Sequence, residues 1–139
     1  MFSVRYYPDV DEVLLAEMAG RLYDTYSYPR IEFNKREYLE RVLLEGSSGS
    51  MFMCFEGSTP VGGITVSDSM YDMHFNGTGK HVLNFVVLPH KDSAKIVRLL
   101  LNELRTTLIR GGKDTWYSTT HRRDFYTLTT KYWRINNSV

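Results

Sequence analysis

The chain has 139 residues, of which 42% are hydrophobic and 24% are charged, and its formal net charge at pH 7 is +1. This composition excludes a disordered or fibrous protein, and the small net charge gives no global reason to expect binding to nucleic acid. We therefore expect one globular domain over residues 1–139. No stretch resembles a transmembrane helix of roughly 20 apolar residues. Cys54 is the only cysteine, which favours a reducing, cytoplasmic setting.

The amino-terminal half predicts a strand, two helices and a hairpin. Each helix starts with an Asp or Asn that is followed three residues later by Glu, a capping signal, and apolar residues then recur at helical spacing. The first helix should end near Tyr28, because a residue before proline avoids the helical region. The expected elements are a strand over 3–7, helices from Asp9 to Tyr28 and from Asn34 to Gly46, and strands over 51–55 and 61–66.

The carboxy-terminal half predicts a buried strand followed by a long helix. Residues 81–88 form a nearly continuous apolar run, which is typical of a strand that is covered on both faces. The later expected elements are a helix from Asp92 or Ser93 to Gly111, a strand over 115–119, a last helix capped by Thr120 and running through Thr129, and a final short strand over 132–135. The order β-α-α-β-β-β-α-β-α(-β) predicts an α/β fold with a mixed, mostly antiparallel sheet flanked by helices.

Three local features give this order a family resemblance. They are the run Val82–Leu88 that ends at Pro89, the leucine-rich helix that ends at Gly111-Gly112, and the Phe125-Tyr126 pair after the next strand. This arrangement resembles the GNAT superfamily of N-acetyltransferases over essentially the whole chain. The resemblance implies that acetyl-CoA lies against the central strand and the start of the following helix.

The resemblance implies a set of cofactor-binding residues. These are Phe85, Val86, Val87, Leu88, Lys91, Ser93, Ala94 and Lys95. In the family, a glycine-rich loop lets the diphosphate approach the free N–H groups of a helix start. Here residues 92–97 read Asp-Ser-Ala-Lys-Ile-Val, so side chains fill all three glycine positions and Asp92 replaces a basic residue.

The resemblance also implies a catalytic tyrosine. Tyr126 matches the residue that protonates the departing CoA thiolate in many family members, although it could instead simply pack beside Phe125. The family often uses a glutamate on its central strands to help deprotonate the amine, but residues 81–88 contain no acidic residue. Nearby alternatives are His81, His74, Asp72 and Glu56. The four histidines have no zinc-like spacing, so no metal site is expected.

Two main functions follow from these features. The first is an N-acyltransferase that moves an acetyl group from acetyl-CoA to an amine substrate. The second is a non-catalytic interaction protein that binds a protein partner or forms a homo-oligomer, because short proteins of this type with an altered cofactor loop occur in phages, including as virion components. Residues 91–134 hold ten basic and four acidic residues, which leaves nucleic-acid binding as a weaker, unlikely alternative.

Overall fold

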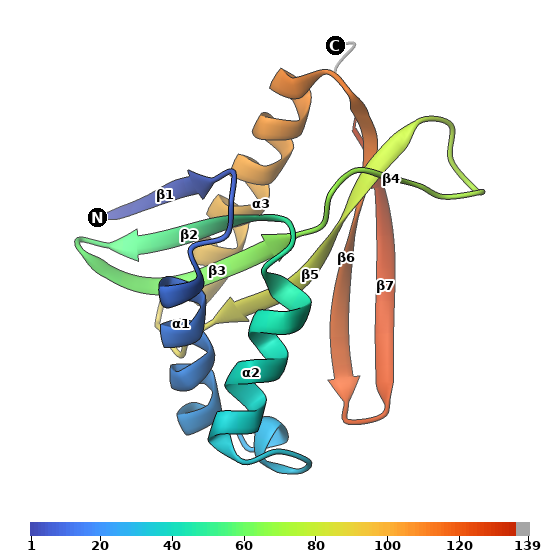
Figure 1. Cartoon of the computed structure of the whole chain (residues 1–139). Helices are drawn as coiled ribbons and strands as arrows, with labels where there is room; N and C mark the ends of the chain where they lie inside the picture. The colour runs from blue at the N-terminus through green and yellow to red at the C-terminus, as the bar shows by residue number, and fades with distance from the viewer. Residues whose placement is uncertain (136–139) are drawn as a thin grey trace.

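The computed structural model describes residues 1–135. Its elements, in chain order, are β1 (Phe2–Tyr7), α1 (Glu12–Thr25), the 3₁₀ turn η1 (Tyr28–Arg30), α2 (Lys35–Gly46), β2 (Ser50–Glu56), β3 (Thr59–Val66), β4 (Met70–Tyr71), β5 (Thr78–Val87), α3 (Ser93–Gly111), β6 (Asp114–Asp124) and β7 (Thr127–Arg134). The strands form one sheet in the order β1-β2-β3-β5-β6-β7, with the short β4 beside β5 (Figure 1). All strand pairs are antiparallel except β5–β6. The expected α/β class is confirmed.

The predicted start of α2 is confirmed, whereas α1 is capped by Asp11 and not by the predicted Asp9, and it ends at Thr25, before Tyr28. The Asn34 side chain accepts a hydrogen bond from the backbone of Glu37, whose side chain in turn accepts one from the Asn34 backbone, so α2 begins with a complete capping box. The cap of α1 is Asp11, which accepts from the Leu14 N–H. Gly112 ends α3 in the left-handed conformation with φ of 66°, which glycine adopts without steric cost.

The predicted last helix is wrong. Residues 114–134 form a long β-hairpin, in which Phe125 and Tyr126 occupy the turn between β6 and β7. Many of its residues are threonines or aromatics, which favour strands because their side chains pack well across a pleated surface. One such cross-strand pair is Thr120 with Thr130, whose hydroxyl oxygens are 3.2 Å apart. The expected final strand is confirmed and belongs to this hairpin as β7.

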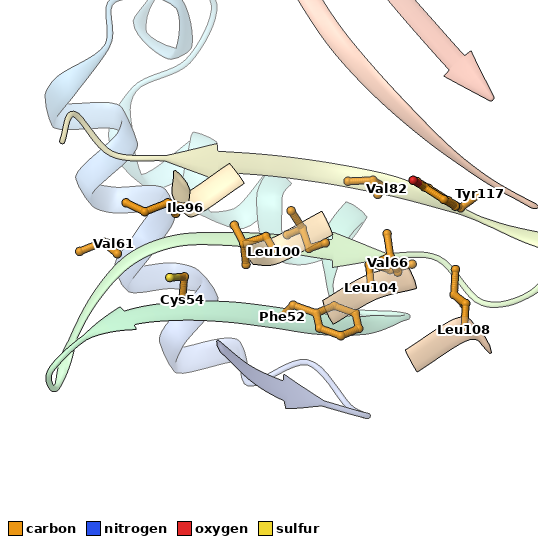
Figure 2. Packing of buried hydrophobic residues seen from close by; sticks show 11 residues of the cluster. Phe52, Cys54, Val61, Val66, Val82, Ile96, Leu100, Leu104, Leu108 and Tyr117 are labelled. Carbon is orange, nitrogen blue, oxygen red and sulfur yellow. The ribbon is translucent and has the colours of Figure 1, made fainter. Parts of the chain in front are cut away.

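The two faces of the sheet carry separate hydrophobic clusters. On one face, α3 packs Ile96, Leu100 and Leu104 against alternate residues of the strands, including Phe52 and Cys54 (Figure 2). On the other face, α1 and α2 cover the intervening residues, which include Met51 and Met53 of β2. The sheet is therefore the middle layer between helices, as the alternation of side chains along a strand requires.

Candidate active site

β5 and β6 are neighbours over only part of their length. Their parallel register pairs Thr78–His81 with residues between Asp114 and Ser118. Beyond these residues β5 continues along β3, and β6 continues along β7. Within residues 1–135, each strand thus has an edge without a strand partner over its carboxy-terminal part, and the two strands separate into a wedge (Figure 1).

A bulge in β5 lies where this separation begins. Along β3, neighbouring residues pair with Val82 and then with Asn84, so the register skips Leu83. A bulge changes the faces on which the surrounding side chains lie. Val82 and Phe85 both pack in the cluster under α3, whereas the side chain of Asn84 turns to Thr65 and bonds with it.

The backbone of β5 beyond the bulge offers hydrogen-bonding groups to the wedge. The Leu88 N–H donates to the Val61 oxygen of β3 at 3.1 Å. Alternate residues of an antiparallel strand direct their backbone groups to opposite edges, so Phe85 and Val87 direct theirs away from β3. Consistent with this direction, the Val87 oxygen accepts a hydrogen bond from the Tyr26 hydroxyl at 3.1 Å.

A cavity of about 1100 Å³ occupies the wedge and is lined by elements from both faces of the sheet. On the α3 side its walls include Phe85, Val87, Val97 and Leu101. On the other side, α1, η1 and α2 supply apolar and tyrosine side chains, which include Leu15, Met18, Leu22, Tyr28, Tyr38 and Val42. This volume is sufficient for a small-molecule ligand. The wedge joins the two faces of the sheet beside the backbone of β5.

The start of α3 has free hydrogen-bond donors. Within residues 1–135, the N–H groups of Ala94 and Lys95 form no backbone hydrogen bond. The side chain of the preceding residue, Asp92, makes no capping hydrogen bond. The Lys95 ammonium lies over the Phe2 ring, 5.5 Å from its centre. The helix start can therefore attract an anion through its N–H groups and the nearby lysine, while Asp92 opposes that attraction.

The predicted cofactor-binding residues fall into two groups. Phe85, Val86 and Val87 line the cavity, while Leu88 is buried next to it with 7% of its surface exposed. The others lie on the exposed approach to α3 and its first turn, outside the cavity lining, and these are Lys91, Ser93, Ala94 and Lys95. Their role toward acetyl-CoA stays a prediction.

Tyr126 lies in the β6–β7 turn with 90% of its surface exposed. The cavity lining contains its neighbour Phe125 but not Tyr126. Two other tyrosines, Tyr28 and Tyr38, do line the cavity, and burial raises the pKa of each hydroxyl above its ordinary value. Sequence reasoning missed both, because neither lies near a motif that carries the resemblance.

The four candidate bases do not line the cavity. His74 and Asp72 pair at 2.9 Å, and the backbone and side-chain hydrogen bonds from His74 hold the pKa of Asp72 below its ordinary value. Glu56 pairs at 3.1 Å with His90, in the loop between β5 and α3. His81 contacts the buried Ser118 hydroxyl below the wedge. Of the four, only His81, which directly precedes Val82, lies near the bulge, and its side chain is turned to Ser118.

Sequence reasoning also missed the role of Asn84, the polar residue in the apolar run. Its amide nitrogen donates to the Thr65 hydroxyl at 2.8 Å. A Cβ atom added to Gly46 of α2 would lie 2.9 Å from that nitrogen, so the glycine provides the space that the amide needs. Asn84 also lines the cavity. A signal was present in the sequence, since Asn84 is the one polar interruption between Val82 and Leu88.

Several solved structures with the same fold are acetyltransferases. A GNAT-family acetyltransferase from Brucella melitensis, solved with acetyl-CoA, is 14% identical and has a TM-score of 0.61, with 100% of this chain and 91% of that chain covered. The ribosomal-protein-alanine N-acetyltransferase of Brucella melitensis biovar Abortus 2308 is 13% identical and has a TM-score of 0.62, with 88% of this chain and 82% of that chain covered. The aminoglycoside acetyltransferase HMB0005 from an uncultured soil metagenomic sample is 14% identical and has a TM-score of 0.59, with 89% of this chain and 82% of that chain covered.

These likenesses define the fold as that of the GNAT acetyltransferases, which confirms the expected architecture. No model of a protein family matches the sequence, and no curated protein matches it either. In the part of the chain that the structure describes, no helix is long and apolar enough to cross a membrane, and no cluster of three or more metal-binding side chains occurs.

Proposed function

We propose that the protein is an N-acetyltransferase that transfers the acetyl group of acetyl-CoA to an amine in the wedge between β5 and β6. The observation that carries this proposal is the free edge of β5 after Leu83, which faces a cavity lined from both faces of the sheet. A chain of amides, such as the arm of CoA, can bond with such an edge in the way that a neighbouring strand would.

The residues present fit the thioester-bearing arm better than they fit the diphosphate. Phe85 and Val87 supply backbone groups and an apolar wall to the arm. At the start of α3, the free N–H groups of Ala94 and Lys95 would meet the diphosphate, but the Asp92 carboxylate weakens the attraction. We therefore expect weaker binding of CoA than a glycine-rich loop would give.

Catalysis in this site would rest on positioning. The amine nitrogen attacks the thioester carbon, the carbon–sulfur bond breaks, the amine loses a proton to solvent, and the thiolate gains one. Backbone N–H groups at the free edge of β5 would stabilise the charge that develops on the carbonyl oxygen. Tyr28 in the cavity wall and Tyr126, the tyrosine that the motif predicts, are the two candidates to protonate the thiolate.

A direct test is turnover of acetyl-CoA with a panel of primary amines, followed by the release of free CoA and the mass of the product. The proposal predicts amine-dependent release and a mass gain of one acetyl group on the amine. The matched control is Val97→Arg, which would place a charged side chain in the cavity wall and should abolish turnover. Release that is independent of any amine would contradict the proposal.

A second candidate function is a non-catalytic interaction protein that assembles with a protein partner or with itself. The observation that favours it is the start of α3, where Asp92 precedes exposed side chains instead of glycines. This candidate predicts a stable complex or oligomer without acetyl transfer. Sedimentation of the purified chain, measured alongside the turnover assay, separates the two functions.

A further inference from the structure

The chemistry of the cavity also limits the acceptor amine. We propose that the acceptor is a primary amine of low pKa carried on an apolar body, and that the side-chain oxygen of Asn84 holds it by accepting a hydrogen bond. This inference rests on the proposed acetyltransferase function. It follows from the way Asn84 is fixed, from the residues beside it and from the charge of the cavity wall.

Asn84 is held in one orientation by its neighbours. Its Nδ2 donates to Thr65 Oγ1 at 2.8 Å and lies against Gly46. With the nitrogen used in this way, Oδ1 is the remaining polar atom, and within residues 1–135 it has no hydrogen-bond partner. No buried side-chain oxygen or nitrogen is left without a partner in this part of the chain, so Oδ1 must be accessible. Because Asn84 lines the cavity beside the bulge, this oxygen can accept a hydrogen bond from an amine.

An amide oxygen cannot remove a proton from an ammonium group at neutral pH. Along Val82–Leu88, where the separation of β5 from β6 would place the reaction, the chain has neither a carboxylate nor an imidazole. The acidic and imidazole groups of the cavity lining are on other elements and all are exposed, and they are Glu32, Glu45, His121 and Asp124. Residues 136–139 read Asn-Asn-Ser-Val and add no such side chain. None of these groups shares a strand with Asn84 and none is buried, which favours an amine that arrives largely unprotonated.

The cavity wall indicates what the amine is attached to. On the α1 and α2 side, part of the wall is apolar and is formed by Leu15, Met18, Leu22 and Val42. The charged lining side chains balance, with three carboxylates from Glu32, Glu45 and Asp124 and three guanidinium groups from Arg41, Arg122 and Arg123. Arg41 and Glu45 also pair at 3.9 Å. A balanced wall does not select a polycation, so an apolar body with a single amine fits best.

Two sources supply such an amine, namely the α-amine of a peptide and an aromatic amine. The test uses the tripeptide Ala-Phe-Lys amide in two forms, one with the lysine amine blocked and one with the α-amine blocked, and aniline as the third acceptor. An α-amine has a pKa of about 7.8 and a lysine amine about 10.4. At pH 7 the unprotonated fraction of the former exceeds that of the latter by roughly 300-fold.

The proposal predicts that kcat/KM at pH 7 favours the free α-amine over the free lysine amine by about 10²-fold or more. The preference should shrink by roughly sevenfold per pH unit between pH 8 and pH 10, where the lysine amine gains far more unprotonated form than the α-amine does. A preference for aniline over the peptide would support an aromatic source, and the reverse would support a peptide. Equal use of both peptide forms at pH 7 would overturn the inference.

Variants of Asn84 test whether its side chain holds the acceptor amine. Asn84→Ala should raise the KM for the amine about tenfold, the loss of one hydrogen bond, with the Kd of acetyl-CoA unchanged. Asn84→Asp, of nearly the same size, places a carboxylate there and should narrow the preference for the α-amine at pH 7 by tenfold or more. Thr65→Val should loosen Asn84 and raise the same KM by a smaller factor.

The results also separate the two proposals. If acetyl-CoA does not bind and no amine is acetylated, the proposed function fails and this inference fails with it. If amines are acetylated but Asn84→Ala leaves their KM unchanged, or Asn84→Asp leaves the preference unchanged, only this inference is overturned.

Discussion

The hydroxyl of Tyr26, in the segment after α1, donates a hydrogen bond at 3.1 Å to the backbone oxygen of Val87, near the end of β5. That oxygen lies on the edge of β5 that faces the wedge, where an amide of the CoA arm would bond in the proposed complex. In the proposed complex, Tyr26 would therefore compete with the ligand for this acceptor.

Removal of this hydroxyl should strengthen binding. Tyr26→Phe should lower the Kd of acetyl-CoA by about 3- to 10-fold, because one hydrogen bond of about 0.5–1.5 kcal/mol no longer has to be broken. Calorimetric titration measures the change. The control is Tyr71→Phe, at a tyrosine that is 84% exposed and outside the cavity lining, and its hydroxyl's loss should leave the Kd unchanged. A weaker affinity in Tyr26→Phe would mean that the tyrosine helps to hold the ligand.

The carboxylate of Asp92 should also change the Kd of acetyl-CoA, through its negative charge. It precedes α3 and makes no capping hydrogen bond, so Asp92→Asn removes repulsion of the diphosphate at little structural cost. We expect the Kd to fall by about 2- to 5-fold at low salt, with the gain lost as salt screens the charge. Asp11→Asn, which removes the same charge at the start of α1, serves as control. A gain of equal size in both variants would indicate a general effect of net charge.

The identity of the thiolate's proton donor can be tested with two variants. Tyr28 lines the cavity, whereas Tyr126 is 90% exposed in the β6–β7 turn. We expect Tyr28→Phe to lower kcat by about 10²-fold, the usual contribution of a general acid, and Tyr126→Phe to have the smaller effect. Pre-steady-state kinetics should locate the loss in the chemical step. The opposite ranking would assign the donor to Tyr126, as the motif predicts.

Burial of tyrosine hydroxyls predicts how stability changes at alkaline pH. Burial raises the pKa of Tyr28, Tyr38 and Tyr117 above the ordinary value of 10.0. Above about pH 10 the unfolded chain therefore loses these protons while the folded chain retains them, so the free energy of unfolding should fall as pH rises. Denaturant titrations of Tyr38→Phe should show a shallower fall than the parent protein. Tyr71→Phe, at a site that is 84% exposed, should not.

The close contact of Gly79 with Trp116 should be essential for the stability of the region where β5 and β6 pair, before they separate. A Cβ at Gly79 would lie 2.0 Å from the indole ring of Trp116, which is fully buried. Gly79→Ala should therefore destabilise the fold by about 3 kcal/mol. Gly111→Ala is the matched control, because nothing lies within 4 Å of its added Cβ, and it should be neutral or stabilising by about 0.5 kcal/mol. Equal melting temperatures of the two variants would contradict the packing described at Trp116.

Much of the fold could be predicted from local patterns, because caps, apolar spacing and turn residues act over a few positions. The capping box at Asn34 and the glycine after α3 are of this kind. The hairpin over 114–134 was missed because a capping threonine followed by residues at helical spacing also suits a helix. Pairing along the whole of β6 and β7 decides between the two structures.

The site was harder to predict, because it depends on contacts between distant residues. The bulge at Leu83 exists only in the register between β3 and β5. The orientation of Asn84 depends on Thr65 and on the absence of a side chain at Gly46. The polar interruption at Asn84 marks the position but not these contacts, whereas the apolar run Val82–Leu88 was evident from the sequence and its residues 83–87 line the cavity.

Calorimetric titration of the purified chain with CoA, repeated with Val97→Arg, tests most directly the claim that the wedge between β5 and β6 holds the CoA arm. The parent protein should bind one CoA per chain saturably, and Val97→Arg, whose substitution lies in the cavity wall, should lose this binding. An absence of binding at millimolar CoA, or equal binding by both proteins, would contradict it.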